Sequence, residues 1–217
     1  MASKIAPLRA ADIRKAPRKE LTRAQKVEKT RRDLIDAAVR IVGKLGYEGD
    51  SIANITTQAK VAQGTFYNYF KSRQDILDQL LPMMGDEMTQ YIRVRMNPDA
   101  RGAAREKQRI ELYFDFLFNH PWYHRLVNEA ETMAPKAHKV YFKKISEGYI
   151  RSLTRMVERG EIKCLTLQQL EPIVYILLST RTYLAQRYVF SKKGAVSKVP
   201  AEVVDTYVQF VSRALFN

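Results

Sequence analysis

The amino-acid sequence predicts an all-helical fold for its 217 residues. Apolar residues recur at intervals of three and four along most of the chain, which is the period of an amphipathic helix. No segment alternates between apolar and polar residues for long enough to indicate a strand. Hydrophobic residues make up 46% of the chain, enough to build a core and to exclude wholesale disorder. We therefore expect a folded protein made of helices.

The chain is strongly basic, with a formal net charge of +14. Basic residues are densest at the front, where residues 1–33 hold eleven lysines and arginines against four acidic residues. Such a segment is attracted to a polyphosphate such as nucleic acid. The alternative is a charge excess that only keeps the protein in solution.

Cysteine usage and hydropathy indicate a protein of the reducing cytoplasm. Cys164 is the only cysteine, which excludes an intrachain disulfide and a thiolate metal cluster. The first thirty residues do not resemble a secretory signal, and the longest apolar window, residues 173–178, is too short for a bilayer. Three histidines, His120, His124 and His138, show no metal-binding spacing. We expect no metal, no cofactor and no membrane partner.

The first 46 residues contain a polar stretch and then a long helix. Residues 1–21 are basic, include two prolines and lack an amphipathic period, so we interpret them as a flexible arm. Thr22 and Gln25 have the spacing of a capping box that opens a helix. Gly46 supplies a terminating residue. One face of this helix is apolar, with Leu34, Ala38, Ile41 and Leu45.

Three further helix starts follow closely. Ser51 is a good N-cap for a short helix over 52–59, with Ile52, Ile55 and Ala59 facing inward. A third helix is predicted over 63–70. Ser72 then caps a longer helix through its pairing with Asp75. The buried side of that helix is predicted to hold Ile76, Leu77, Leu80 and Leu81.

A turn-rich interruption at 97–102 separates these elements from the remainder of the chain. Helix start signals beyond it are Asn119 before Pro121, Pro135, and Thr166 with Gln169. The helices predicted there cover residues 103–118, 121–132, 135–160, 167–189 and 200–216.

The two short helices at 52–59 and 63–70 are separated by a tight turn and cannot bury much surface alone. We expect them to pack on the preceding helix as a compact helix-turn-helix unit, which presents the leading edge of its last helix to solvent. Phe66 and Phe70 are four residues apart and should anchor that helix. The edge carries small or polar groups able to enter a DNA major groove: Gln63, Gly64, Thr65, Tyr67 and Asn68. The alternative is a helical hairpin that packs on protein.

Other side chains of this unit are placed to reach flanking phosphates through hydroxyls and cations. The complete set of candidate DNA contacts is Ser51, Thr56, Lys60, Gln63, Gly64, Thr65, Tyr67, Asn68, Tyr69, Lys71 and Arg73. The basic arm adds Arg14, Lys15, Arg18 and Lys19, which either follow phosphates or enter the minor groove, or belong to a tail that contributes only diffuse attraction.

About 50 residues of this region resemble the TetR family. The resemblance rests on Gly46-Tyr47 after the first helix, on Ser51 before the second, and on the run Gly64-Thr65-Phe66-Tyr67-Asn68-Tyr69-Phe70 in the third. Two residues depart from the family pattern. Lys60 replaces the usual turn glycine and would have to adopt a positive φ, and Ala62 cannot cap the third helix with its side chain.

The resemblance implies a helix-turn-helix DNA-binding domain over 22–73 and a helical effector-binding and dimerisation domain over 74–217. It implies a sequence-specific transcriptional regulator: a homodimeric repressor that a small-molecule effector releases from a palindromic operator on double-stranded DNA. A ligand-responsive activator and a non-specific nucleic-acid binder are the alternatives. We do not expect an enzyme, because the sequence lacks an acid–base or metal constellation.

The last two predicted helices each carry two apolar stripes, which requires two packing partners. In the first they are Leu170, Val174, Leu177, Arg181, Leu184 and Tyr188, beside Ile173, Ile176, Thr180, Tyr183 and Arg187. In the second they are Val204, Val208, Val211 and Leu215, beside Val203, Tyr207, Phe210 and Ala214. A four-helix contact across a twofold axis would bury both second stripes. The alternative is one thick monomer core.

Arg181 lies within an apolar stripe, where an unpaired cation is costly. We expect it to pair either with an acidic effector or with a carboxylate at the dimer contact, such as Glu171 or Glu202. Aromatic residues between 113 and 149 either line an apolar, partly aromatic effector pocket or form core. The candidate effector contacts are Tyr113, Phe116, Trp122, Tyr149, Leu177 and Arg181.

Overall fold

The computed structural model describes residues 22–190 and 196–216, and within those ranges it contains helices and no strand, so the prediction of an all-helical fold is confirmed. The predicted arm at 1–21 lies outside the described residues. The elements in chain order are α1 (Arg23–Leu45), α2 (Ile52–Ala59), α3 (Gln63–Phe66), α4 (Arg73–Arg95), α5 (Gly102–Asn119), α6 (Trp122–Met133), α7 (Pro135–Glu158), a 3-10 turn η1 (Leu167–Gln169), α8 (Leu170–Tyr188) and α9 (Ala201–Leu215).

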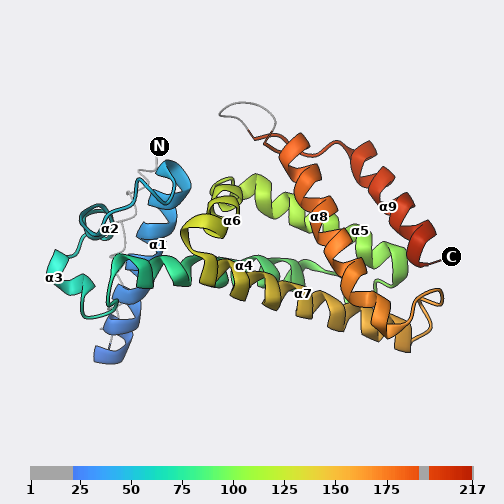
Figure 1. The fold of residues 1–217 in the computed structure, drawn as a ribbon, viewed down its shortest axis with the longest axis horizontal. Coiled ribbons are helices and arrows are strands. Elements are labelled where there is room, and N and C mark those ends of the chain that lie inside the picture. Colours follow the sequence, from blue (N-terminus) through green and yellow to red (C-terminus); the bar gives the residue numbers. More distant parts are fainter. Residues whose placement is uncertain (1–21, 191–195, 217) are drawn as a thin grey trace, which may run out of the picture.

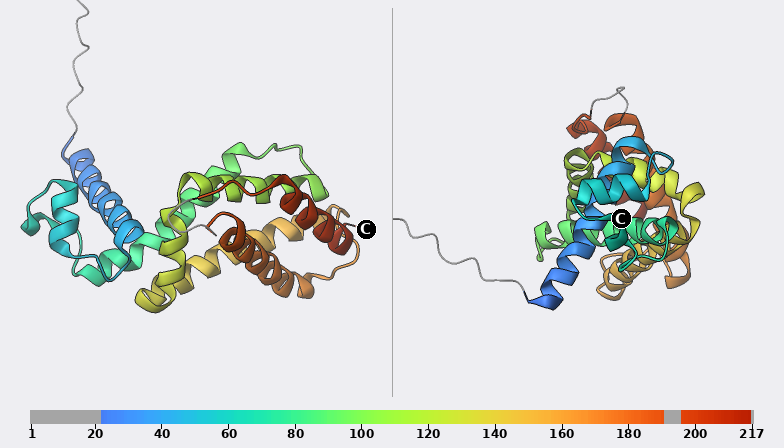
Figure 2. Two further views of the ribbon diagram at one scale, coloured as in Figure 1. Left: turned by 90° about the horizontal axis from the view of Figure 1, so that it is seen from above. Right: turned by 90° about the vertical axis from the view of Figure 1, so that its left-hand side faces the viewer.

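The molecule is elongated, with α2 and α3 at one end of its long axis and α8 and α9 towards the other (Figures 1 and 2). α1, α2 and α3 form a small unit, in which α2 packs on α1 and α3 on α2. The longer helices α4, α5 and α7 form the body, with α8 on α7 and α9 on α5. α4 runs from the small unit into the body, so a continuous helix joins the two units (Figure 1).

Local capping explains where several helices begin. The Thr22 hydroxyl accepts from the Gln25 N–H at 3.2 Å, and the Gln25 side chain accepts from the Thr22 N–H at 2.9 Å, which completes the predicted capping box. Ser51 accepts from the N–H of Asn54 and Ser72 from that of Asp75, both at 3.1 Å. Each cap satisfies a donor that the first turn of a helix leaves without a partner.

Packing confirms most of the predicted inward faces. Ile76, Leu77, Leu80 and Leu81 of α4 are all buried, as are Leu34, Ala38 and Ile41 of α1. Leu45 is an exception: it is 54% exposed at the last position of α1, where the chain turns away at Gly46 with φ of 83°. The prediction that Leu45 belongs to the buried face is wrong for that reason.

The second stripes of α8 and α9 lie largely on the surface. Ile176 and Tyr183 on α8 and Phe210 on α9 are 51%, 72% and 63% exposed. Tyr207 differs, because it is 5% exposed and points into the chain rather than away from it. Within one chain, α8 and α9 therefore present an uncovered apolar surface that we call the α8–α9 face: Tyr175, Ile176, Tyr183 and Phe210.

Candidate nucleic-acid interface and effector cavity

The turn between α2 and α3 sets the position of α3. Lys60 ends α2 in the left-handed conformation, with φ of 59°, as its place in the turn predicts. Ala62 makes no side-chain cap, also as expected. The α-helical part of α3 ends at Phe66, whereas the sequence predicted a helix to Phe70.

The difference arises from tighter hydrogen bonding after Phe66. The N–H groups of Asn68 and Tyr69 donate to the carbonyl oxygens three residues earlier, at 3.2 and 3.0 Å, which makes a turn rather than continued α-helix. Phe66 and Phe70 are at most 1% exposed and their ring centroids lie 5.4 Å apart, so both anchor the segment as predicted.

The leading edge of this segment faces solvent at the far end of the molecule (Figures 1 and 2). Gln63, Gly64, Tyr67 and Asn68 are exposed, and Tyr67 keeps 57% of its surface. A Cβ built on Gly64 would meet no atom within 4 Å, which leaves the backbone open to a close approach. The edge thus combines hydrogen-bonding side chains with an unobstructed backbone, as a groove-binding helix requires.

The other candidate DNA contacts fall into two groups. Lys60 precedes and Lys71 follows the leading edge in the sequence, and both are exposed, as side chains that contact phosphates must be. Ser51, Thr65 and Tyr69 are half-buried, and the Ser51 hydroxyl is engaged in capping α2.

Thr56 and Arg73 already have hydrogen-bond partners within the small unit, and their predicted DNA contacts stay predictions. Thr56 is 3% exposed and its hydroxyl donates to the carbonyl oxygens of Ile52 and Ala53. Arg73 donates from Nε to the Asp50 carbonyl oxygen at 3.1 Å and from Nη2 to the Tyr47 carbonyl oxygen. Sequence spacing could not show that these groups already had partners.

Arg73 also compensates a buried charge. Its Nε lies 3.3 Å from Oδ2 of Asp50, whose side chain has no exposed surface. Burial raises the pKa of Asp50, and the nearby Arg73 charge opposes that rise. The Arg73–Asp50 pair therefore fixes the start of α4 to the loop before α2.

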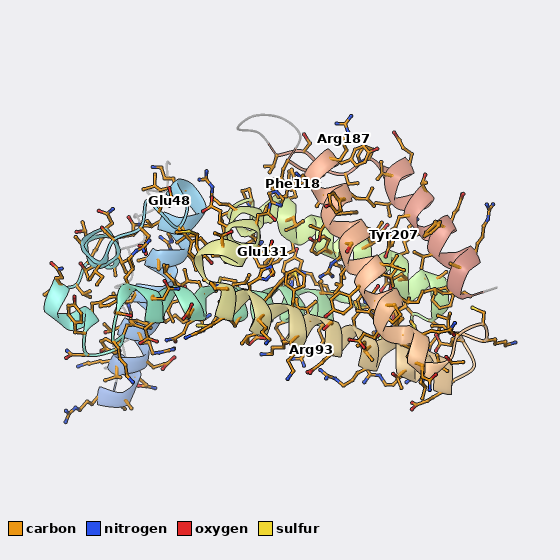
Figure 3. The ribbon with its side chains drawn as sticks, viewed as in Figure 1. Glu48, Arg93, Phe118, Glu131, Arg187 and Tyr207 are labelled. Atoms are coloured by element: carbon orange, nitrogen blue, oxygen red, sulfur yellow. The ribbon has the colours of Figure 1, made fainter. Side chains whose placement is uncertain are left out.

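A cavity of about 350 Å³ lies among α4, α5, α7 and α8. Its volume falls within the range of small-molecule sites. One part of its wall is apolar, with Met88, Ile92, Met96 and Ile145, and another part is basic, with Arg93, Arg105, Arg109, Lys144 and Arg181. Figure 3 labels Arg93 of α4 below the ribbon of α7. No lining residue is acidic.

Arg181 lines this cavity and is 8% exposed. Its guanidinium carbon lies 4.4 Å from the centroid of the Tyr113 ring, and its Nε has no hydrogen-bond partner. Among residues 22–190 and 196–216 no carboxylate pairs with it, and the suggested partners Glu171 and Glu202 are both exposed. Within one chain neither glutamate pairs with Arg181, so the two alternatives from sequence, an acidic effector and a carboxylate at the dimer contact, both stay predictions.

The remaining candidate effector contacts are dispersed. Tyr149 lines the cavity, and Tyr113 lines a separate, nearly filled space of about 20 Å³ between α5, α6, α7 and α8. Phe116 stacks on His120 with centroids 4.2 Å apart, and Leu177 is buried. Neither of them lines the cavity, nor does Trp122. Of the five basic residues that line the cavity, only Arg181 was predicted from the sequence. The other four lie on three different helices, and only the fold brings them together.

A buried carboxylate connects the cavity wall to α9. Glu106 is 2% exposed and accepts from the hydroxyls of Tyr149 and Tyr207, while Arg109 donates to its other oxygen at 2.7 Å. Burial and the Glu106 charge raise the pKa of both tyrosines, so both stay protonated donors. Tyr207 lies between α8 and α9 in the view of Figure 3.

Contacts between α1 and α6 join the small unit to the body. Gly43 has no side chain where Trp122 packs, and a Cβ there would overlap the Trp122 side chain. The Tyr47 N–H donates to Oε2 of Glu129 at 2.8 Å, and Arg125 donates to the Lys44 carbonyl oxygen at 2.7 Å. Trp122 therefore has a structural role at this junction.

Residues 22–190 and 196–216 contain neither a cluster of metal-binding side chains nor a helix able to span a membrane. In that part of the chain, no three His, Cys, Asp or Glu side chains converge as metal ligands would. None of the helices there combines the length and the apolar character that a membrane crossing requires.

Comparison with known proteins places this geometry in a family. The family model described as "Bacterial regulatory proteins, tetR family" matches residues 34–80. The fatty acid metabolism regulator protein of Bacillus subtilis is 32% identical over 141 residues, which cover 60% of this chain and 69% of that protein. The transcriptional repressor NicS of Pseudomonas putida is 30% identical over 106 residues, and the match spans about half of each chain.

Solved structures share the fold. The fatty acid degradation regulator FadR of Bacillus halodurans superposes with a TM-score of 0.69 at 22% identity, covering 84% of this chain and 94% of that one. FadR of Bacillus subtilis, solved in complex with stearoyl-CoA, gives 0.67 at 19% identity, covering 83% and 96%.

Proposed function

This chain belongs to the TetR family of bacterial transcriptional regulators, and from that premise we propose that it binds a palindromic operator as a homodimer and releases it when a small acyl compound binds. The observation that carries the DNA-binding part is the exposed leading edge of α3 at the tip of the molecule. Gln63, Tyr67 and Asn68 offer donors and acceptors for base edges, and Lys60 and Lys71 offer cations for phosphates.

The partner in the dimer is a second copy of this chain, and the α8–α9 face is the proposed contact. Its exposed tyrosines, isoleucine and phenylalanine form an apolar patch that a twofold axis would cover with the same patch. Such a dimer would present two copies of α3 to successive major grooves, about 34–36 Å apart.

An acyl-type effector is supported by the relatives and by the cavity. Two of the similar proteins carry fatty acid regulation in their names, and one structure holds stearoyl-CoA. The cavity of this chain offers an apolar wall beside cations. The effector would abolish operator binding if it favoured a conformation in which the spacing of the two α3 segments does not match the operator. A difference of a few kcal/mol between its binding free energies for the two conformations is sufficient.

Selection from a pool of random duplexes tests the DNA-binding proposal. The intact protein should enrich a palindromic site, and Tyr67→Ala and Asn68→Ala should each weaken binding to that site about tenfold, as expected when a contact to a base edge is lost. Glu131→Ala is the matched control, since Glu131 is exposed on α6 (Figure 3) and should bind like the wild type. If no site is enriched, the protein is a charge-only nucleic-acid binder and the proposal fails.

Transcription from a template that carries the selected site distinguishes repression from activation. The proposal expects the protein to lower transcript yield and an acyl compound to restore it. A yield that rises with the protein would identify an activator instead.

A further inference from the structure

The effector cavity carries more positive charge than the carboxylates around it balance. Arg109 pairs with Glu106 at 2.7 Å and Lys144 with Asp86 at 2.6 Å, whereas Arg93 contacts the neutral Gln90. Arg105 and Arg181 form no ion pair with any carboxylate of the described residues. Three cations of one cavity thus lack a counter-charge among the described residues; Arg93 is exposed to solvent, whereas Arg105 and Arg181 are the two that are not.

Arg181 is the more deeply placed of these two cations. It lines both the large cavity and the small aromatic space beside Tyr113, and its buried Nε has no hydrogen-bond partner. Stacking on the Tyr113 ring offsets part of the cost of burying a cation, but it leaves the N–H unused. This N–H group is free to donate to a negatively charged ligand group.

Arg105 lies among other cations. Burial lowers its pKa, and the charges of Arg109, Arg101, Arg155 and Arg159 lower it further. An anion beside Arg105 would oppose each of these effects, because a negative charge favours the protonated guanidinium.

The apolar wall of the same cavity sets a second requirement for the ligand. Met88 and Ile92 lie on successive turns of α4, Met96 is the residue that follows the helix, and Ile145 of α7 also lines the cavity. A ligand that satisfies both walls has an acidic group and an aliphatic body. The methionine side chains suit a flexible aliphatic chain, because they are unbranched and pack against irregular shapes.

We propose that Arg181 and Arg105 bind the acidic group of an amphipathic anion whose aliphatic body lies against Met88, Ile92, Met96 and Ile145. This rests on the proposed function, since the anion is taken to be the effector. The acidic group is either the carboxylate of a fatty acid or a phosphate of its coenzyme A thioester. In both cases recognition depends on negative charge, and an uncharged analogue of the same chain length binds poorly.

Calorimetric titration of the intact wild-type protein with three twelve-carbon probes, all below their micellar concentrations, tests the charge requirement. The probes are dodecanoate, dodecanoyl-CoA and 1-dodecanol. At least one of the two anions should bind at least tenfold more tightly than the alcohol, since a charge-assisted contact contributes that much. Whichever anion binds more tightly identifies the source of the acidic group.

Variants test the assigned residues. Arg181→Met and Arg105→Met should each weaken binding of the preferred anion at least tenfold and leave binding of 1-dodecanol within about twofold. Arg181→Lys should restore part of the affinity. The matched control is Arg151→Met, which removes a positive charge from an exposed site on α7 and should titrate like the wild type. Thermal melting of each variant establishes that it is folded.

Three results would overturn the proposal: no binding of any probe, binding of 1-dodecanol as tight as that of the anions, or wild-type affinity in both Arg181→Met and Arg105→Met. The comparison of probes uses only wild-type protein, so it stands even where a variant does not fold. These titrations contain no DNA. Failure of the operator proposal, seen as no enriched duplex, is therefore distinguishable from failure of the anion site.

Discussion

The hydroxyl of Tyr207 on α9 donates a hydrogen bond to Oε1 of Glu106 on α5 at 3.0 Å. The same oxygen accepts from Tyr149, and Arg109 neutralises the carboxylate from the other side. Residues of α5, α7 and α9 thus meet at one buried charge. Tyr149 and Arg109 also line the effector cavity, so this carboxylate links the cavity wall to a helix of the α8–α9 face.

Tyr207→Phe should lower the free energy of unfolding by about 2 kcal/mol, because a buried carboxylate loses one of its donors. Urea unfolding followed by circular dichroism measures this change. Tyr67→Phe is the control, since Tyr67 is exposed and should unfold like the wild type. A Tyr207→Phe variant as stable as the wild type would mean that Glu106 does not depend on α9.

Arg73→Met should lower the free energy of unfolding by about 2 kcal/mol at pH 7.5, because it leaves the buried Asp50 carboxylate without its counter-charge. Arg40→Met, at an exposed position of α1, is the matched control and should change it little. This measurement tests the structural role of Arg73 in the absence of DNA.

The loss of unfolding free energy caused by Arg73→Met should be smaller at pH 5.0 than at pH 7.5. The pKa of Asp50 is raised in the folded chain, so the folded state binds that proton more tightly than the unfolded state. Stability therefore rises as the pH falls through the raised pKa. Removal of Arg73 raises this pKa further. A deficit that stays constant between pH 7.5 and 5.0 would exclude Asp50 as its cause.

Gly43→Ala should destabilise the protein by about 1–3 kcal/mol, because the added methyl group overlaps Trp122 at the α1–α6 junction. Gly148→Ala offers a contrast with the same chemistry. Its added Cβ has only one neighbour, at 3.8 Å, so helix propensity should stabilise it by about 0.5–1 kcal/mol. Thermal melts of the two variants should shift in opposite directions; a shared direction would contradict the packing seen at Gly43.

Lys71→Ala should reduce the salt dependence of operator binding. Each phosphate contact adds about 0.9 to the log–log slope, so two copies in a dimer should lower it by about 1.8. Fluorescence anisotropy across a series of salt concentrations gives the slope. Lys139→Ala, which removes an exposed charge from α7, should leave the slope unchanged.

The sequence predicted features that depend on neighbouring residues. The caps at Thr22, Ser51 and Ser72 follow from side chains within a few positions, so spacing is sufficient to find them. The positive φ of Lys60 was expected from the resemblance to the family, which has a glycine there. The end of α3 was predicted too late, because the tightened turn after Phe66 depends on how the two phenylalanines reach the core.

The sequence could not predict features that depend on contacts between residues far apart in the chain. Thr56 has a suitable side chain for DNA, but its burial depends on packing within the three-helix unit. The spacing of Tyr207 assigns it to the outer stripe of α9. Its side chain instead donates to Glu106, which is 101 residues away in the chain. The cavity cations come from α4, α5, α7 and α8, and only the fold brings them together.

Hydroxyl-radical footprinting of the selected duplex tests the central claim most directly, namely that a twofold dimer reads DNA through the exposed edge of α3. The account predicts two protected segments on one face of the duplex, centred about 10–10.5 base pairs or a multiple of that apart. Both segments should lose protection in a Tyr67→Ala, Asn68→Ala double variant. A single protected segment, or two that persist unchanged in the double variant, would contradict it.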